Sequence, residues 1–429
     1  MKKIFVTLAA ALVAFAASAI LDSAASAQDF SSRWEIIYKS AEKQLWTSQG
    51  EIASARGAEA TLSVKGSGLS FDFADKKHYF EVAGMKPGDS IELSAPLSAP
   101  LPKGSLVDVA IYLGITKKGG PANWAFEWFD GKKWREVEKG PAFRTTREKG
   151  WNETSFIKSF RTGKELKDAL KVRFRVIDGC TDPEAEVYLI NRPRVGAYLA
   201  ASTVPAKDSK RILFIGNSFT FYGATDVAFI EICRSQGHTV DARMNVKGGQ
   251  NFGQHLGLVL SREAIAEGGY DVALLQNQSQ SGSFYATDPK AYAYLRDDAI
   301  AMAAEVREYS PSCRLILERT WASPKEDWRG FGSAEAFDEA LQKGSEQIGK
   351  AMDAELSPIG NAFILGRAAG LDLYWTDNFH QNFTGAYLKA CVNYLMVYGE
   401  PFGEGVSDYC LDPEVAAKCR EIAAKVVFK

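Results

Sequence analysis

The sequence has little net charge and contains no cluster of charge of one sign that dominates the chain. Its 51 lysines and arginines nearly balance 53 aspartates and glutamates, so the formal net charge at pH 7 is −2. This balance gives no broad positive field for binding nucleic acid or an anionic membrane. No basic recognition helix or aromatic RNA-binding strand stands out either. We therefore expect no nucleic-acid partner. The length of 429 residues is sufficient for two or three domains.

Long apolar runs are also missing, except at the start of the chain. The first 27 residues combine Lys2 and Lys3, an apolar stretch, and small residues that end at Ala27. This order is typical of a bacterial signal peptide, with cleavage expected after Ala27. The apolar stretch is marginal for a membrane span, and no later segment is long enough to cross a bilayer. We expect an exported protein, secreted or periplasmic, without a membrane span.

The six cysteines do not form a metal-binding pattern. Their spacing matches no zinc motif, so no metal is expected. In an oxidising compartment Cys410 and Cys419 are close enough in sequence to close a short loop, and the sequence is compatible with a disulfide or with two thiols. Cys233 and Cys391 lie in apolar helical patterns and are expected to be buried thiols.

Residues 28–200 have the pattern of β structure. Short alternating runs such as "DSIELSA" and "KVRFRVI" are separated by Gly, Pro and Asp. The stretch "WAFEWFDGKKWREV" predicts a hairpin with its turn at Asp130 and Gly131. Regularly spaced short strands predict an all-β sandwich, jelly-roll-like, over residues 28–200. A polar linker is expected over residues 201–210.

Residues 211–429 alternate between strand and helix patterns. Strands are expected over 211–216, 239–244, 270–276, 313–320 and 356–360. Helices are expected over 226–236, 253–267, 290–309 and 333–355, with a final helix over 384–399. This alternation predicts a three-layer α/β domain with a five-stranded parallel, flavodoxin-like sheet. Ligands bind such sheets outside the carboxyl ends of the strands, and Ser218 directly follows the first one.

Histidine is scarce, which leaves few bases to activate Ser218 as a nucleophile. The chain has four: His78, His238, His255 and His380. The first three fit structural positions in a strand, after a helix and at a helix start. His380 differs because Asp377 lies three residues before it. In a turn this spacing lets Asp377 bind one ring nitrogen while the other faces Ser218. By itself the pair is more typical of loop and helix-start chemistry.

Together these motifs resemble those of the SGNH, or GDSL-like, hydrolase superfamily. The likeness is carried by "GNSFT" at 216–220, by "DNFH" at 377–380 and by the five α/β units between them, and it covers residues 211–429. Within the superfamily the sequence is most similar to exported bacterial carbohydrate esterases. The resemblance implies that Ser218 is the nucleophile, His380 the base, and Asp377 the carboxylate that orients the base.

The resemblance also implies an oxyanion hole. Two of its donors are the backbone N–H groups of Ser218 and of Gly249, which follows the second strand in "NVKGGQNF". Glycine permits the close backbone approach that such a donor needs. The family's third donor is an Asn side chain, and here the sequence departs from the pattern with "LLQNQS". Alignment by the strand end places Gln278 there, with Asn277 as the alternative.

Aromatic and basic residues after the fourth strand are candidates for substrate binding. Trp321 and Arg319 are expected at the active edge, where an indole can stack on a sugar and a guanidinium can bind a carboxylate. The alternative for each is packing of an insertion against the fold. In the β part, the tryptophans of the predicted hairpin are candidates for glycan binding, but packing is the favoured interpretation for them. They are Trp124, Trp128 and Trp134.

These observations favour an exported serine esterase that acts on a complex carbohydrate through an acyl-enzyme, with O-acetyl groups as the first candidate. No metal or organic cofactor is needed. The alternatives among enzymes are a methyl esterase on uronic acids and a general short-chain esterase. From another class, a non-catalytic glycan-binding protein with a degenerate SGNH fold is compatible with the altered third donor. The expected partner is a glycan or another acylated small molecule.

Overall fold

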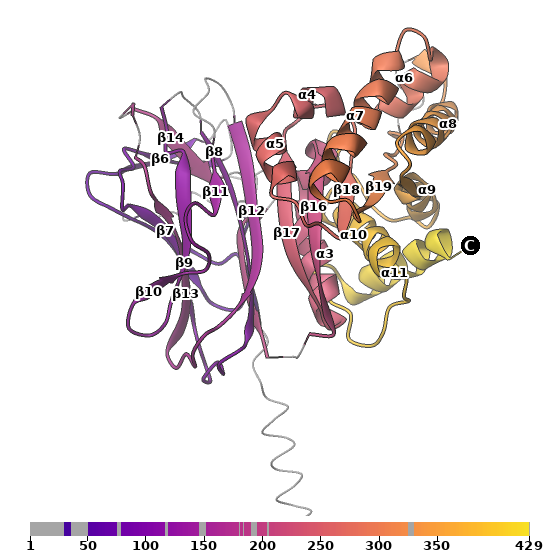
Figure 1. Ribbon diagram of the computed structural model, residues 1–429. Helices are drawn as coiled ribbons and strands as arrows, with labels where there is room; N and C mark the ends of the chain where they lie inside the picture. Colours follow the sequence, from indigo (N-terminus) through magenta and orange to yellow (C-terminus); the bar gives the residue numbers. More distant parts are fainter. Residues whose placement is uncertain are drawn as a thin grey trace, which may run out of the picture.

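The structure is a computed structural model that describes residues 30–35, 50–74, 79–115, 119–145, 152–179, 181–182, 184–189, 195–203, 206–324 and 330–428. The predicted signal peptide and His78 lie outside the described residues. Within those ranges the chain forms a β-rich N-terminal part followed by an α/β part (Figure 1). This division confirms the prediction from the sequence in outline, while the jelly-roll-like connectivity stays a prediction.

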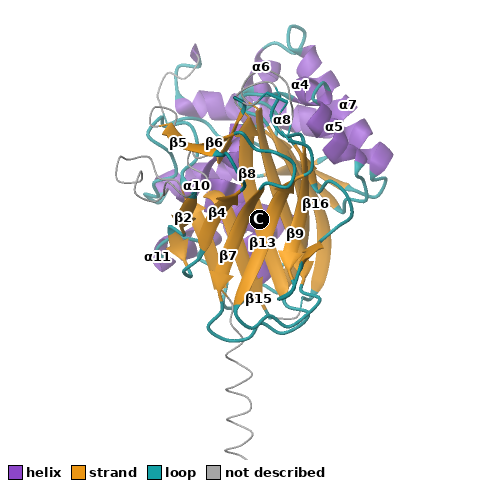
Figure 2. Ribbon diagram, turned by 90° about the vertical axis from the view of Figure 1, so that its left-hand side faces the viewer, coloured by secondary structure: helices purple, strands orange, loops and turns teal. Residues whose placement is uncertain are grey.

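Two antiparallel sheets form the N-terminal part, and Figure 2 shows their strands face on. The first sheet has the order β3-β1-β15-β8-β14-β6-β5, and β12 also pairs with β8. Its strands are β1 (Phe30–Glu35), β3 (Arg56–Gly57), β5 (Ser70–Ala74), β6 (Tyr79–Ala83), β8 (Leu106–Ile115), β12 (Asn152–Arg161), β14 (Glu186–Leu189) and β15 (Val195–Ser202). The second has the order β10-β9-β13-β7-β4-β2, and β11 pairs with β9. Its strands are β2 (Glu51–Ala53), β4 (Thr61–Lys65), β7 (Ser90–Pro96), β9 (Asn123–Phe129), β10 (Trp134–Glu136), β11 (Phe143–Arg144) and β13 (Ala169–Val176).

The predicted hairpin is formed by β9 and β10, with Trp134 opposite Phe129. Side chains of successive strand residues point to opposite faces. Trp124 and Trp128 accordingly point into the core between the sheets, where they are 0 % and 7 % exposed. Trp134 lies on the other face, beneath the guanidinium of Arg173 at 4.3 Å from the ring centre. Packing, the favoured interpretation, therefore holds for Trp124 and Trp128.

The second part contains a parallel sheet of five strands in the order β17-β16-β18-β19-β20. They are β16 (Asp208–Gly216), β17 (His238–Val246), β18 (Val272–Leu275), β19 (Arg314–Glu318) and β20 (Glu355–Ser357). Counted along the chain the order is 2-1-3-4-5, one of the two common orders of doubly wound sheets. The helices are α2 (Ser218–Phe221), η2 (Tyr222–Ala224), α3 (Thr225–Ser235), α4 (Phe252–Leu256), α5 (Val259–Ala266), α6 (Ser281–Thr287), α7 (Ala293–Tyr309), α8 (Ala334–Ala351), α9 (Ile359–Ala368), α10 (Phe383–Tyr398) and α11 (Pro413–Val427).

Both faces of the parallel sheet are covered, because its strands are apolar on both sides. In β16, Ile212 and Phe214 join the core with α3, α9, α10 and α11, whereas Leu213 and Ile215 join the core with α4, α5, α7 and α8. A parallel sheet buried on both faces needs such continuous apolar runs. Since all five strands run in the same direction, the loops that follow them gather at one edge. Ser218 lies at this edge.

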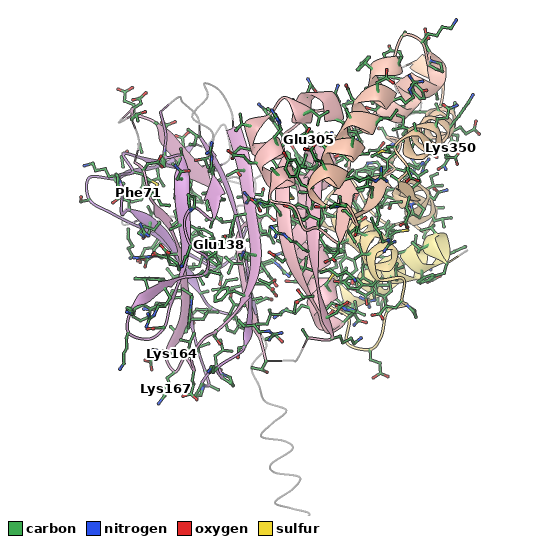
Figure 3. The ribbon with its side chains drawn as sticks, in the orientation of Figure 1. Phe71, Glu138, Lys164, Lys167, Glu305 and Lys350 are labelled. Carbon is green, nitrogen blue, oxygen red and sulfur yellow. The ribbon has the colours of Figure 1, made fainter. Side chains whose placement is uncertain are left out.

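The β-rich part packs directly on the α/β part. Tyr112, Ile157 and Tyr198 of the first sheet belong to the same buried cluster as α3. The strands β12 and β17 stand beside one another, and side chains fill the space between them (Figures 1 and 3). A hydrogen bond from Ser159 Oγ to the carbonyl oxygen of Val240, 2.8 Å long, joins these two strands. The two parts thus share a core.

Several elements differ from the prediction. The expected linker over 201–210 is shorter, because β15 continues to Ser202 and β16 begins at Asp208. The helix expected over 253–267 is split, because α4 ends at Leu256 with Gly257 as its C-cap, and Leu258 is extended. The helices α2, η2, α6, α9 and α11 were not expected, and because of α11 the helix α10 is not the final one. In α11 the start is set by Asp412, whose carboxylate accepts from the N–H of Glu414, and by Pro413 at the first helical position.

Cys410 and Cys419 are thiols in the structure and do not form a disulfide. Cys233, Cys391 and Cys419 are buried, and burial raises the pKa of the Cys233 and Cys391 thiols well above the ordinary value. Among the described helices, none is both long and apolar enough to cross a membrane.

Candidate active site

Ser218 is the first residue of α2, immediately after β16 and the N-cap residue Asn217. The Asn217 side chain accepts from the N–H of Phe219 at 3.1 Å, which starts the helix. Gly216 is required at the end of the strand, since a Cβ there would lie 2.2 Å from Thr220 Oγ1 and 3.0 Å from Gln276 Oε1. The close exit from β16 thus places Ser218, which is half-buried, at the edge of the sheet.

The structure brings Ser218, His380 and Asp377 together, although they are far apart in sequence. The Nε2 atom of His380 lies 2.9 Å from Ser218 Oγ, and its Nδ1 atom lies 2.6 Å from Asp377 Oδ2. With Asp377 ionised, Nδ1 carries the proton and Nε2 is left to accept from the serine hydroxyl. The side chain of His380 is 19 % exposed and that of Asp377 is 42 % exposed, so the three groups open to solvent.

Asp377 is held by its own turn. Its Oδ1 atom accepts from the backbone N–H groups of Phe379 at 2.8 Å and His380 at 2.9 Å. Partial burial acts to raise the pKa of Asp377, but hydrogen bonds from the His380 ring and from these two N–H groups outweigh it and hold the pKa below the ordinary value. The carboxylate therefore stays ionised at neutral pH and orients the ring.

Aromatic rings fix the imidazole of His380 from several sides. Tyr222 stacks on it with ring centres 4.1 Å apart and an interplanar angle of 20°. Phe219 and Phe379 approach edge-on, at 5.6 and 5.2 Å. Because stacked and edge-on neighbours restrict rotation of the ring, Nε2 is directed at Ser218. No sequence pattern predicted the Tyr222 stack, which arises because Tyr222 lies in η2, directly after α2.

Trp321 and Arg319 do not lie where substrate binding would need them, so this expectation is corrected. Trp321 is 2 % exposed, and its indole is stacked between Phe219 at 4.2 Å and Phe363 at 4.0 Å. Arg319 is 1 % exposed and forms a buried ion pair with Asp338. The indole of Trp321 is packed between two rings, and the charge of Arg319 is paired with a buried carboxylate. Both side chains therefore have their partners inside the fold. Packing, the alternative, applies to both residues.

The Gly248–Gly249 loop follows β17 at the same edge. Gly249 has a φ of +73°, a left-handed conformation that glycine adopts readily, and a Cβ built on it would meet nothing within 4 Å. The loop is tied to the nucleophile turn, because Asn217 Nδ2 donates to the carbonyl oxygen of Gln250 at 3.0 Å. The exposed backbone of this loop is thus positioned beside the start of α2.

The third loop distinguishes Asn277 from Gln278. The Oδ1 atom of Asn277 accepts from the N–H groups of Phe252 at 3.2 Å and Gln278 at 2.8 Å. Its Nδ2 group is buried and finds no hydrogen-bond partner within the described ranges. The Gln278 amide is occupied by its own turn, since Oε1 accepts from the N–H of Gln280 at 2.8 Å and Nε2 contacts Ser279 Oγ at 3.3 Å. The geometry favours Asn277 over Gln278 as the free side-chain donor.

Gln276 is a site residue that the sequence did not single out. Its Oε1 atom accepts from the N–H of Asn217 at 3.0 Å and from Thr220 Oγ1 at 3.1 Å. Its Nε2 group donates to the carbonyl oxygen of Asn277. Gln276 therefore joins the first loop to the third. Its position at the end of a buried strand was visible in the sequence, but the direction of its side chain was not.

The other two described histidines have side-chain partners other than Ser218 Oγ. His255 is buried, and its Nδ1 atom lies 2.8 Å from Ser261 Oγ. Burial lowers the pKa of His255 to about 4. His238 lies between Asp208 at 2.6 Å and Glu400 at 2.7 Å, close to the start of β17. In the part of the chain that the structure describes, no group of three or more His, Cys, Asp or Glu side chains is arranged to hold a metal ion.

No family model matches this sequence, and no curated protein matches it either. The chain is similar to several solved structures at low identity. A DUF4886 family protein from Bacteroides uniformis has 18 % identity and a TM-score of 0.44, and the match covers 52 % of this chain and 95 % of that one. A carbohydrate esterase family 2 enzyme with a carbohydrate-binding domain, from Corynascus thermopiles, has 12 % identity and a TM-score of 0.36, over 74 % and 95 % of the two chains. An acetylxylan esterase from Geobacillus stearothermophilus has 13 % identity and a TM-score of 0.34, over 47 % and 98 %.

Proposed function

We propose that this protein is a serine ester hydrolase. The observation that carries the proposal is the hydrogen-bonded series from Ser218 Oγ to His380 Nε2, and from His380 Nδ1 to Asp377 Oδ2, at 2.9 and 2.6 Å. A hydroxyl, a base and an orienting carboxylate in this order are what a serine nucleophile requires. The lowered pKa of Asp377 supports the same assignment, because an ionised carboxylate stabilises the imidazolium that forms during the reaction.

The mechanism follows from these contacts. His380 takes the hydroxyl proton as Ser218 attacks the ester carbonyl, and then gives it to the leaving alcohol. The oxyanion accepts from the backbone N–H groups of Ser218 and Gly249 and from Asn277 Nδ2, which replaces Gln278 as the proposed side-chain donor. In the second half, His380 takes a proton from water as the water attacks the acyl-enzyme, and it returns that proton to Ser218 Oγ as the acid leaves. The residues of this chain supply each of these roles.

We propose that the substrate is an ester on a complex carbohydrate outside the cytoplasm. An O-acetyl group is the first candidate. The exposure of Asp377 and His380 supports a substrate that is part of a large molecule, because such an ester must reach the nucleophile from the surface. The predicted signal peptide supports export. A uronic-acid methyl ester and a short-chain ester are the alternative substrates, and they differ in the product released.

The test is hydrolysis of p-nitrophenyl acetate by the wild type, by Ser218→Ala and by Asp377→Asn. We expect turnover by the wild type, none above background for Ser218→Ala, and a loss of about 10⁴-fold in kcat for Asp377→Asn, which presents the wrong ring tautomer. Circular dichroism and melting temperatures check that the variants are folded. Release of acetate or of methanol from acetylated and methylated glycans then identifies the ester. A folded wild type that hydrolyses no ester but binds glycans would support the non-catalytic alternative.

A further inference from the structure

The helix that begins with Ser218 is one turn long, and its carbonyl groups need partners from elsewhere. After α2 the chain passes through η2, where Gly223 has φ +67° and ψ 9° and is not helical. A Cβ on Gly223 would lie 2.6 Å from Ala386 Cβ and 2.7 Å from the carbonyl oxygen of Asn382, so the break is also a close approach to α10. The helix does not continue after α2, so its last carbonyl groups lack the N–H partners that a further helical turn would supply.

Two side chains from the His380 loop and α10 donate to this turn. Lys389 Nζ donates to the carbonyl oxygen of Phe219 at 2.8 Å, and Gln381 Nε2 donates to the same oxygen at 2.9 Å. Gln381 Nε2 also donates to the carbonyl oxygen of Tyr222 at 2.9 Å. Phe219 directly follows Ser218, and Gln381 directly follows His380. These hydrogen bonds thus join the segment of the nucleophile to the segment of the base.

Lys389 is a buried ion with a buried counter-ion. The side chains of Lys389 and Glu318 are 1 % and 2 % exposed, and Nζ lies 2.7 Å from Glu318 Oε2. Asn393 Nδ2 donates to Glu318 Oε1 at 2.7 Å. Burial lowers the pKa of Lys389, and the Glu318 carboxylate acts against this shift. In the ammonium form, Lys389 pairs with the Glu318 carboxylate while it donates to the Phe219 carbonyl oxygen.

A buried ion pair is a poor means of stabilising a fold, because desolvation of both charges offsets their attraction. An apolar side chain of similar volume would fill the same space in α10 at no such cost. What the ammonium adds is a strong hydrogen bond to one chosen carbonyl group, since hydrogen bonds from charged donors are about twice as strong as neutral ones. That carbonyl belongs to the residue next to the nucleophile.

We propose that Lys389, held by Glu318, is a positioning residue for Ser218. It fixes the carbonyl oxygen of Phe219 and thereby the distance from Ser218 Oγ to His380 Nε2. The expected effect on kcat rests on the proposed function. The effect of Lys389 on the position of α2 can be measured without turnover. Misplacement of a reacting group by about 1 Å costs up to about 100-fold in rate, so the effect belongs in kcat and leaves KM unchanged.

The experiment uses the double variant Lys389→Met/Glu318→Gln in the full chain. It removes both charges at once, which avoids an unpaired buried ion, and glutamine keeps an acceptor for Asn393. The matched control is Arg33→Met/Glu231→Gln, which removes another buried ion pair, with side chains 6 % and 3 % exposed, at the contact with the β-rich part. We expect kcat for p-nitrophenyl acetate, per folded molecule, to fall about 10- to 100-fold in the first variant only.

A second measurement separates this inference from the proposed function. Amide hydrogen exchange in the Ser218→Ala background is expected to speed up in α2 when Lys389 and Glu318 are replaced, and not in the control. If the wild type hydrolyses esters and the first variant keeps its kcat within twofold, the positioning role is wrong. If the wild type hydrolyses no ester, the proposed function fails; faster exchange in α2 then still supports the placement by Lys389, and unchanged exchange overturns it.

Discussion

At the scale of single residues, Asn217 shows how one side chain organises three loops. Its Oδ1 atom starts α2 by accepting from Phe219, and its Nδ2 group donates to the carbonyl oxygens of Gln250 at 3.0 Å and Asn277 at 3.3 Å. The loops after β16, β17 and β18 are therefore fixed to one another before a substrate arrives. Preorganised donors of this kind are the largest source of stabilisation for a developing oxyanion.

The first prediction concerns the two neighbouring amides. Asn277→Asp keeps the oxygen that accepts from Phe252 and Gln278 but removes the buried N–H donor. We expect kcat to fall about 100- to 1,000-fold, the usual loss for one oxyanion donor. The matched change Gln278→Glu is expected to stay within about fivefold of the wild type. Steady-state kinetics with p-nitrophenyl acetate measure both, and equal losses, or a larger loss for Gln278→Glu, would contradict the assignment.

The sequence was sufficient to select Ser218, Asp377 and His380 as candidates only through the combination of "GNSFT" and "DNFH", since each motif alone is typical of turn and loop chemistry. The sequence did not predict the role of a side chain where that role depends on the direction in which the side chain points. Trp321 and Arg319 come from the expected segment, yet both point inward, toward Phe219 and Asp338. A sequence pattern places a residue on an element. It does not say whether the side chain packs inside the fold or faces the exposed edge of the sheet.

At the scale of elements, short helices at the carboxyl edge of the sheet hold the site. The helix α4 follows the Gly248–Gly249 loop and carries a capping box, in which Asn251 and Gln254 bond to one another's backbone N–H groups. Its last turn contains the buried His255. Because burial lowers the pKa of His255, we expect the stability of the fold to depend on pH through this side chain.

The second prediction follows from the pKa of His255, which burial lowers to about 4 from an ordinary value of 6.5. As the pH falls below about 6.5 the unfolded chain binds a proton at this residue and the folded chain does not. The stabilisation from neutral His255 is thus complete above pH 6.5 and is lost as the pH falls toward 4, by about 3 kcal/mol in all. The free energy of unfolding of His255→Gln should therefore fall by about 2 kcal/mol less than that of the wild type between pH 7 and pH 4.5.

Urea unfolding at the two pH values measures this difference, and all other titrating groups are common to both proteins. Equal losses in the wild type and in His255→Gln would show that His255 is not held neutral in the fold. Glutamine suits the comparison because it does not titrate and can still bond to Ser261, the partner of His255 Nδ1.

Elements were predictable where apolar residues repeat over a full strand or a long helix. The five parallel strands were expected because each is a short apolar run between turn residues, and α7 and α8 because their periodicity is long. The missed helices α6 and α9 have other causes. In α6 the stretch "SGSFYAT" has low helical propensity and is stabilised by packing against α8. The helix α9 begins at Ile359, a residue that the expected strand over 356–360 included.

At the scale of the whole molecule, the β-rich part is built onto the α/β part through α3. Tyr112 Oη of β8 donates to Asp226 Oδ2 in the first turn of α3 at 2.6 Å. Arg33 of β1 pairs with Glu231 of the same helix and lies over the ring of Tyr409, 4.4 Å from its centre. Since α3 also packs on α10, the β-rich part and the helices of the α/β part are joined through one core.

The third prediction compares two tyrosines at this contact, both 0 % exposed. Tyr112→Phe removes a hydrogen bond to the buried Asp226 carboxylate and should lower the free energy of unfolding by about 1–3 kcal/mol. The hydroxyl of Tyr198 has no hydrogen-bond partner among the described residues, so Tyr198→Phe should be close to neutral or stabilising. Thermal and urea unfolding of the full chain provide the comparison. A Tyr112→Phe variant as stable as Tyr198→Phe would contradict the role of this contact.

The assignment of Ser218 as an activated nucleophile is tested most directly by its reaction with a fluorophosphonate, followed by mass spectrometry of the digested protein. We predict a single phosphonyl adduct on the peptide that contains Ser218 in the folded wild type. The adduct should be absent from Ser218→Ala and from urea-unfolded protein, and should form far more slowly in Asp377→Asn. A folded wild type without an adduct on Ser218, or with the same labelling rate after unfolding, would contradict a serine hydrolase.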